Sequence, residues 1–311
     1  MRFAGPRTAA VSYAVPMREV RPVRRRLIAV DLDGTLYGRG GGVSAANLRA
    51  IGAARAAGHR VVVATGRSWL ESREARAALR GACDADDVLI GAGGALVSNL
   101  LDGRTIERDP VDVEAAAAVA RSLVGHGHHV QLLQDPDSAE CDYLLLGDPL
   151  DPTLSWWLDR YGHRTRRLAT PPGVGDLGHT VRVGTVTTAR ELATVVAELR
   201  RDLGDRLTIH HWQAVGPPGA ADPPELVEAF APGTSKWRAI ERLCGRWGID
   251  PADTVAIGDG INDLEMIRES GLGVAMGNAD PRIHEVADRR VAPHDRDGVA
   301  EAIAAVLDDR W

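Results

Sequence analysis

The sequence predicts an α/β fold: a doubly wound, Rossmann-like parallel sheet with a smaller α+β domain inserted into it. Three observations support this prediction. Short continuous apolar runs alternate with helical segments in residues 26–98, the same alternation returns in residues 226–311, and the stretch between them follows a different pattern. Continuous apolar runs are typical of strands buried on both faces, and their alternation with helices implies parallel strands with right-handed crossovers.

The first part is expected to hold three buried strands, at residues 27–30, 61–64 and 88–90. Ser44 is a suitable N-cap for the helix that joins the first two strands, and this helix is expected to end near Gly58. A second helix is expected over residues 70–79. The order of these elements is that of a βαβαβ unit.

The last part repeats this order, beginning with a helix over residues 236–247 whose apolar residues fall on one stripe. A buried strand is expected at residues 254–257. The elements expected after it are a helix containing Leu264 and Ile267, a strand at 273–276, a helix near 281–287, an extended run at 290–291 and a final helix over 299–307.

The middle of the chain is expected to form the inserted domain. Its candidate elements are strands at 143–146, 181–183 and 207–212 and a helix over 189–203. Turn-rich sequences flank them, with Asp109-Pro110 near the entry and residues 216–219 near the exit. The predicted organisation is a flexible N-terminal extension (1–25), the first core part (26–98), the inserted domain (99–225) and the second core part (226–311).

Composition narrows the classes of partner. The 311 residues include 44% hydrophobic and 26% charged residues, as in soluble globular proteins. The net charge of −6 argues against nucleic acid or an anionic membrane as the partner. No apolar run approaches the roughly 18 residues of a spanning helix. The three cysteines are scattered without metal-site spacing, which favours reduced thiols and a cytoplasmic location. The oligomeric state is left open.

Polar residues begin where three of the buried strands end. Asp31, Thr65 and Asp259 each lie just past the end of an apolar run, and ligands of open α/β sheets bind at the carboxyl ends of the strands. With Asp33 and Asp263 close in sequence, several carboxylates would crowd together and repel one another unless a cation is bound. Hard oxygen ligands in small number are typical of Mg²⁺.

The same edge offers positive potential to an anion. Lys236 and the backbone amides around Leu32, Gly34 and Gly66 are its candidate sources, so the site is suited to a phosphate held on a metal. In an Asp-x-Asp pair, one carboxylate can attack phosphorus while its neighbour protonates the leaving oxygen and later activates water. Either aspartate motif taken alone is equally compatible with an ordinary turn.

Taken together, the motifs resemble the haloacid dehalogenase superfamily of phosphohydrolases. The four motifs occur in family order as Asp31-Leu32-Asp33-Gly34-Thr35-Leu36, Thr65-Gly66-Arg67, Lys236 and Gly258-Asp259-Gly260-Ile261-Asn262-Asp263. Further short sequence segments, at residues 233–236, 262–266, 274–279 and 297–299, resemble the Cof-type branch of this superfamily. Its members are mostly sugar-phosphate and related phosphatases. The resemblance covers residues 26–98 and 226–311 well, and the middle only by position.

The resemblance implies roles for individual residues. Asp31 is similar to the family's nucleophile and Asp33 to its general acid/base. The implied Mg²⁺ ligands are Asp31, the Asp33 backbone carbonyl and Asp259, with Asp263 in the outer shell. The implied phosphate-binding set is the Leu32 amide, Thr65, Gly66, Lys236 and Asn262.

Motif spacing locates the inserted domain. Only 32 residues separate Asp33 from Thr65, and a loop, a helix and a strand use them. By contrast, 171 residues separate Thr65 from Lys236, far more than a crossover needs. The insertion therefore belongs in the second gap, which is the C2 cap position of the superfamily. A cap over the crevice would exclude water and select the leaving group.

The function predicted from these observations is Mg²⁺-dependent hydrolysis of a small phosphorylated metabolite, a sugar phosphate first, through an aspartyl-phosphate. Two alternatives remain. A phosphomutase would use the same covalent intermediate but isomerise its substrate, and a binding or regulatory module would hold a phosphorylated ligand without turnover. The substrate and the cap residues that select it are not predicted, because specificity resides in side chains that the motifs do not include.

Overall fold

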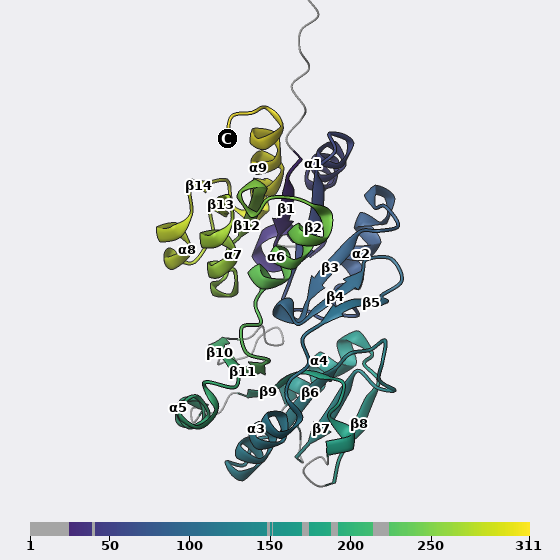
Figure 1. Cartoon of the computed structure of the whole chain (residues 1–311), viewed down its shortest axis with the longest axis vertical. Coiled ribbons are helices and arrows are strands. Elements are labelled where there is room, and N and C mark those ends of the chain that lie inside the picture. Colours follow the sequence, from purple (N-terminus) through teal and green to yellow (C-terminus); the bar gives the residue numbers. More distant parts are fainter. Residues whose placement is uncertain are drawn as a thin grey trace, which may run out of the picture.

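A computed structural model describes residues 25–38, 41–147, 150, 152–169, 174–187, 192–213 and 224–311. Two parts, each built on its own sheet, are stacked along the long axis of the molecule (Figure 1). We call the upper part the core and the lower part the cap. The predicted N-terminal extension lies almost wholly outside the described residues.

The core sheet has eight strands among the described residues, in the order β14-β13-β12-β1-β2-β3-β4-β5. Their bounds are β1 (Leu27–Val30), β2 (Arg60–Ala64), β3 (Val88–Gly91), β4 (Leu96–Asn99), β5 (Thr105–Arg108), β12 (Thr254–Gly258), β13 (Leu272–Ala275) and β14 (Arg289–Arg290). From β14 to β3 all neighbours pair in parallel, whereas β4 and β5 are antiparallel additions. The central strand β1 is buried at every position, as its continuous apolar run predicts.

Helices cover both faces of the core sheet. On one face lie α1 (Ala45–Ala56), α2 (Arg73–Leu79) and α9 (Gly298–Leu307). On the other lie α6 (Lys236–Trp247), α7 (Leu264–Glu269) and α8 (Pro281–Val286). Side chains of β1 alternate between the two layers, with Ile28 and Val30 facing the first and Leu27 and Ala29 the second. This three-layer arrangement confirms the predicted doubly wound α/β core.

Helix α6 shows how the sequence sets an element that carries a site residue. The Ser235 hydroxyl caps its start by accepting from the Arg238 amide. Trp237, Ile240 and Cys244 form the predicted apolar stripe and are buried against the sheet. The helix therefore begins at Lys236 and presents that lysine at the carboxyl ends of the strands.

The cap is built on six strands among the described residues, in the order β10-β11-β9-β6-β7-β8. They are β6 (Val130–Gln134), β7 (Tyr143–Leu146), β8 (Thr165–Arg167), β9 (Thr180–Thr187), β10 (Thr208–Gln213) and β11 (Glu225–Phe230). Helices α3 (Val113–Gly125) and α5 (Leu192–Leu203) share one apolar cluster with the sheet. Helix α4 (Pro152–Tyr161) packs instead in a cluster that includes Ala92 and Leu96 of the core, so it lies in the seam between the two parts.

The sheets divide the chain at different points from those expected. β4 and β5 pair with the core sheet, which therefore continues to Arg108 rather than ending at residue 98. β11 pairs with β9 and β10 of the cap, so the second core part begins after Phe230 rather than at 226. The physical reason is that the residues of a short strand do not show which sheet provides its partner.

One helix begins later than expected, and the expected start of another lies outside the described residues. α2 starts at Arg73 instead of residue 70, because the preceding residues form a turn in which the Ser72 amide and hydroxyl both bond to the Ser68 carbonyl. The helix expected over 189–203 is described from Leu192 onward, and its first expected residues lie outside the described ranges.

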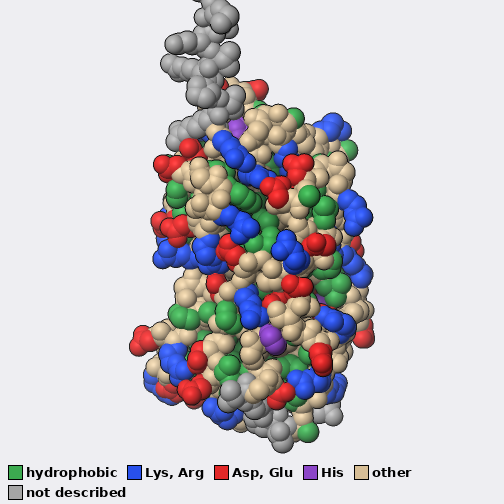
Figure 2. All heavy atoms as spheres, turned by 45° about the vertical axis from the view of Figure 1, so that its right-hand side comes forward, with side chains coloured by type: hydrophobic (Ala, Val, Ile, Leu, Met, Phe, Trp, Pro, Cys, Tyr) green, Lys and Arg blue, Asp and Glu red, His purple; other side chains and the backbone are tan. Residues whose placement is uncertain are grey.

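No helix in the described part of the chain is long and apolar enough to cross a membrane. Cys83, Cys141 and Cys244 are all free thiols. Side chains of both charge signs are mixed over the face shown in Figure 2, and neither sign forms a continuous field there.

Candidate active site

Three strand ends bring the predicted site residues to one edge of the core sheet. β1 lies between β12 and β2 in parallel register, so the residues that follow these strands are neighbours. Asp31 follows β1, Thr65 follows β2 and Asp259 follows β12. The Asp31 amide is fixed by the Ile257 carbonyl of β12 at 2.9 Å.

Lys236 connects two carboxylates at this edge. Its ammonium nitrogen lies 2.6 Å from Oδ1 of Asp31 and 2.6 Å from Oδ1 of Asp263, and the side chain is 1% exposed. Burial by itself would lower the pKa of Lys236, but the charges of Asp263 and Asp31 outweigh burial and raise it. The lysine is therefore a fixed positive charge beside Asp31.

Protein donors hold both carboxylate oxygens of Asp263 in place. Its Oδ2 accepts from the amides of Asp259 and Gly260, at 3.0 and 2.9 Å, while Oδ1 faces Lys236. Both oxygens thus have partners already, an arrangement that suits a residue orienting the site rather than one binding a cation directly.

Asp259 is oriented by two residues to which the sequence analysis gave no role. The Thr35 hydroxyl donates to its Oδ1 at 2.7 Å, and the Asn278 amide donates to its Oδ2 at 3.1 Å. Asn278 also donates to the Gly34 carbonyl at 2.8 Å. Gly34 has φ +78°, and a Cβ there would lie 2.2 Å from Oδ2 of Asp259, so only glycine allows this approach.

The electrostatics of the cluster match a divalent cation. Oxygens of Asp31, Asp259 and Asp263 lie within 4.8 Å of one another. Burial, followed by the charge of Asp263, raises the pKa of Asp31 well above its usual range, and burial raises that of Asp259 to about 6. Lys236 offsets only one of the three carboxylate charges, so the donor set fits a hard cation such as Mg²⁺.

The side chain of Asp33 does not join this cluster. It is 45% exposed and forms a two-pronged ion pair with Arg67, with Nε to Oδ2 at 2.7 Å and Nη2 to Oδ1 at 2.6 Å. The structure therefore brings Asp31, Lys236, Asp259 and Asp263 together and directs the Asp33 carboxylate toward the residues that follow β2.

The predicted phosphate-binding residues border the same edge. Thr65 is 1% exposed, and its hydroxyl oxygen accepts from the Arg67 amide at 3.1 Å. The Asn262 amide nitrogen is 3.8 Å from the position of a Cβ on Gly66, so it lies beside that residue. Leu32 is fully buried in the turn that follows β1. These residues therefore follow β1, β2 and β12 at the edge that carries Asp31.

The sequence did not predict several residues that contact the site. Thr35, Arg67 and Asn278 stand inside quoted motifs, and that position was the only signal for them. Glu71 of the core and Tyr161 and Arg182 of the cap also contact this region. Nothing in the sequence pattern marks these three. Tyr161 and Arg182 meet the core across 94 and 116 positions, and Tyr143, a cap partner of Glu71, is 72 positions away.

Comparison with known proteins agrees with this geometry. A family model for haloacid dehalogenase-like hydrolases matches residues 28–142 and 179–303. The 5-amino-6-(5-phospho-D-ribitylamino)uracil phosphatase YcsE of Bacillus subtilis is 28% identical over 279 residues, which is 89% of this chain and 94% of that protein. YwtE of the same organism, named for the same activity, is 28% identical over 92% of this chain and 99% of its own length.

Solved structures share the fold. A haloacid dehalogenase-like hydrolase from Bacteroides thetaiotaomicron superimposes with a TM-score of 0.73 at 23% identity, covering 91% of this chain and 99% of its own. The subclass IIB sugar phosphatase BT4131 superimposes with a TM-score of 0.71 at 20% identity, with coverages of 91% and 99%. The likeness includes the cap as well as the core.

Proposed function

Because the chain belongs to the haloacid dehalogenase-like hydrolase family and is a phosphatase of phosphorylated small molecules, we propose that it works through an aspartyl-phosphate on Asp31. The observation that carries this proposal is the buried contact of Asp31 with Lys236 at the edge where three strands end. Asp31 is held rigidly beside a fixed positive charge, as a nucleophile for a phosphoryl group must be.

Two aspartates carry out the two steps of the proposed reaction, and other residues bind the phosphoryl group. The Asp31 carboxylate attacks phosphorus, the bond to the leaving oxygen breaks, and Asp33 gives its proton to that oxygen. Asp33 then takes a proton from water, which attacks the same phosphorus, releases phosphate and restores Asp31. Lys236 and Thr65, with the Leu32 and Gly66 amides and Asn262, hold the oxygens of the transferring group.

Mg²⁺ fits the carboxylate cluster and, when bound, would neutralise charge on the phosphoryl group. Its proposed ligands are Asp31, Asp259 and the Asp33 backbone carbonyl, with Asp263 outside them. The raised pKa of Asp31 and that of Asp259, about 6, support this assignment, because both express repulsion and burial that a cation would relieve.

For the substrate we propose a sugar or polyol phosphate, and a ring attached to it is a specific candidate. Two relatives matching most of this chain are named for a phosphorylated ribitylaminouracil. In the cap, the His210 ring lies 4.8 Å from that of Trp212 and 5.5 Å from that of Phe230. Phe230 in turn approaches Gly93, whose amide bonds to the Thr65 carbonyl. Burial lowers the pKa of His210 to about 4. The half-buried rings of His210 and Trp212, packed beside the buried Phe230, therefore offer a neutral stacking surface.

The test is phosphate release from sugar phosphates, the phosphorylated ribitylaminouracil, nucleotides and phosphoglycolate, with Mg²⁺ or with EDTA. We expect Mg²⁺-dependent release that Asp31→Asn abolishes, and acid-stable trapping of labelled phosphate on the wild-type protein only. Full turnover by Asp31→Asn would refute the assignment of the nucleophile. Isomerised sugar phosphate without released phosphate would favour the mutase.

A further inference from the structure

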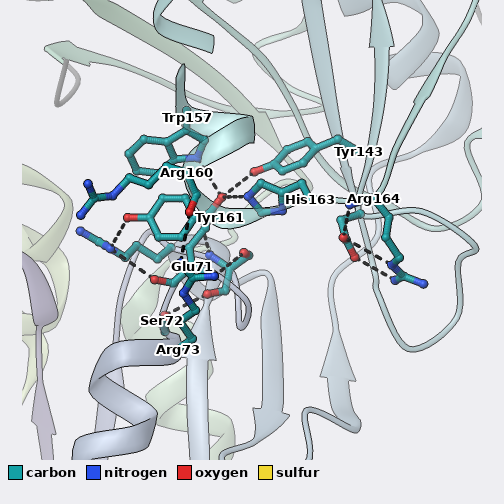
Figure 3. A network of polar contacts seen from close by, with 12 residues as sticks. Glu71, Ser72, Arg73, Tyr143, Trp157, Arg160, Tyr161, His163 and Arg164 are labelled. Carbon is teal, nitrogen blue, oxygen red and sulfur yellow. Dashed lines mark hydrogen bonds and ion pairs between the residues drawn. The ribbon is translucent and has the colours of Figure 1, made fainter. Parts of the chain in front are cut away.

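The core and the cap are joined by buried polar contacts around Glu71 (Figure 3). Glu71 belongs to the core, and its side chain is 1% exposed. Its Oε2 accepts from the Ser68 amide at 2.7 Å. Among the described residues, the partners of its Oε1 all come from the cap: the Tyr143 hydroxyl at 3.1 Å, the Trp157 indole nitrogen at 2.9 Å and Nε2 of His163 at 3.1 Å.

The charge on Glu71 favours one position of the cap on the core. Burial by itself would raise its pKa, but the His163 contact and the Arg182 charge lower the pKa to about 2. Glu71 is therefore an ionised carboxylate out of water, and a buried charge is tolerated only with its partners in place. The cap partners of Glu71 come from β7, from α4 and from the residues after α4. Only one position of the cap on the core brings all of them to the Glu71 carboxylate.

The network continues from Tyr143 to Arg182 on the middle of the cap sheet. Arg182 donates to the Tyr143 hydroxyl at 2.8 Å and pairs with Glu228 of the neighbouring strand at 2.6 Å. Its side chain is only 9% exposed. One guanidinium nitrogen reaches across the seam and donates to the Gly66 carbonyl at 3.1 Å. The cap thus touches the turn predicted to bind phosphate.

This contact has a geometric consequence for Thr65. The Gly66 carbonyl and the Arg67 N–H belong to one planar trans peptide and point in opposite directions. Arg182 fixes the carbonyl, and the N–H donates to the Thr65 hydroxyl oxygen at 3.1 Å. Since that oxygen accepts here, its own hydrogen points elsewhere, and within the described residues no protein acceptor takes it. The hydroxyl is left as a donor for a phosphate oxygen.

We propose that Arg182 is a positioning residue: from the docked cap it holds the Gly66–Arg67 peptide so that Thr65 presents its hydroxyl proton to the substrate phosphate. Glu71 fixes the cap where Arg182 can reach. The inference rests on the proposed function, in which Thr65 binds phosphate, and adds that a cap side chain sets the geometry of the core's phosphate site. Arg182 itself touches neither the phosphate nor the reacting atoms.

The test measures inorganic phosphate affinity by calorimetry with Mg²⁺ present, using the whole chain. Arg182→Met combined with Glu228→Gln removes the ion pair without leaving a buried unpaired carboxylate. Glu228→Gln alone is the matched control, because it keeps Arg182 on the Gly66 carbonyl. Arg182→Lys is a milder variant that keeps the charge but cannot reach all three partners. We expect phosphate affinity to fall about tenfold or more in the double variant, by a smaller factor in Arg182→Lys, and little in the control.

A Thr65→Val background separates positioning from general damage. If Arg182 acts through the Thr65 hydroxyl, the double variant costs no further affinity once that hydroxyl is gone. Equal losses in both backgrounds, or full phosphate affinity in the double variant and in Arg182→Lys, would overturn the inference while leaving the phosphatase assignment intact. A wild-type protein that neither bound nor released phosphate would overturn the proposed function and the inference with it.

Discussion

Replacing Lys236 by methionine tests the electrostatic account of the site most directly. The ammonium lies 2.6 Å from carboxylate oxygens of both Asp31 and Asp263 and is almost completely buried. Methionine fills similar space without charge, so Lys236→Met leaves two buried carboxylates facing each other with Asp259 nearby. We expect a folded but inactive protein of much lower stability.

The size of the expected loss in the free energy of unfolding follows from the burial of these side chains. Removing one partner of a buried pair costs about 3–5 kcal/mol, and here two carboxylates lose the same partner, so the upper end is expected. That corresponds to roughly three orders of magnitude or more in the unfolding equilibrium. The difference in stability between wild type and variant is expected to become smaller as pH falls. The Lys236 charge lowers the pKa of Asp31, so removing it raises that pKa further above its unfolded value. The folded variant therefore binds more protons than the folded wild type and gains more stability on acidification.

The assay is urea unfolding of wild type and variant, free of Mg²⁺, at pH 8 and pH 5. Arg238→Met is the matched control on the same helix, because Arg238 pairs with Glu241 on the exposed face, and it should leave the midpoint unchanged. A loss below about 1 kcal/mol, the size found for exposed pairs, or a loss independent of pH, would refute the account of Lys236.

Three further predictions concern the cation site and the seam. Asn278→Ala removes a donor to Asp259 and should weaken Mg²⁺ binding roughly 10–100-fold; unchanged calorimetric affinity would contradict the role given to Asn278. Because the pKa of Asp259 is raised to about 6, protons compete with the cation, so Mg²⁺ should bind more tightly at pH 7.5 than at pH 5.5. The lowered pKa of Glu71, about 2 against an ordinary 4.5, means that its contribution to cap docking is complete above pH 4.5 and is lost as pH falls toward 2. Fluorescence of Trp157 should report this acid transition, and Glu71→Gln should remove it.

Sequence reasoning located the core and its site because the signals there are local. The strands before Asp31, Thr65 and Asp259 are continuous apolar runs, and the polar residue that ends each run marks the functional edge. The start of α6 at Lys236 follows from its capping serine and apolar stripe. Each of these features can be recognised within a dozen residues of sequence.

The seam could not be predicted in this way. Glu71 stands before a helix among polar residues, where a glutamate is normally solvated, and its partner Tyr143 is 72 positions away. Arg182 meets the Gly66 carbonyl across 116 positions. In both contacts a charged group is buried because another domain brings its partners to it, and no periodicity within one segment carries that information.

The cap surface that faces the core has two regions, a middle with buried charges and an edge with uncharged rings. Because side chains alternate along a strand, Arg182 and its neighbour Glu228 share this surface with His210 on β10. Changing Arg182 alone would leave the Glu228 carboxylate buried without its ion-pair partner and would disturb docking. Among the described residues, the contacts of His210 are ring contacts, so changing it leaves no buried charge without its partner. Variation that alters substrate selection while preserving phosphate chemistry is therefore expected toward the β10 edge, and the middle of the sheet is constrained by the need to dock on Glu71 and Gly66.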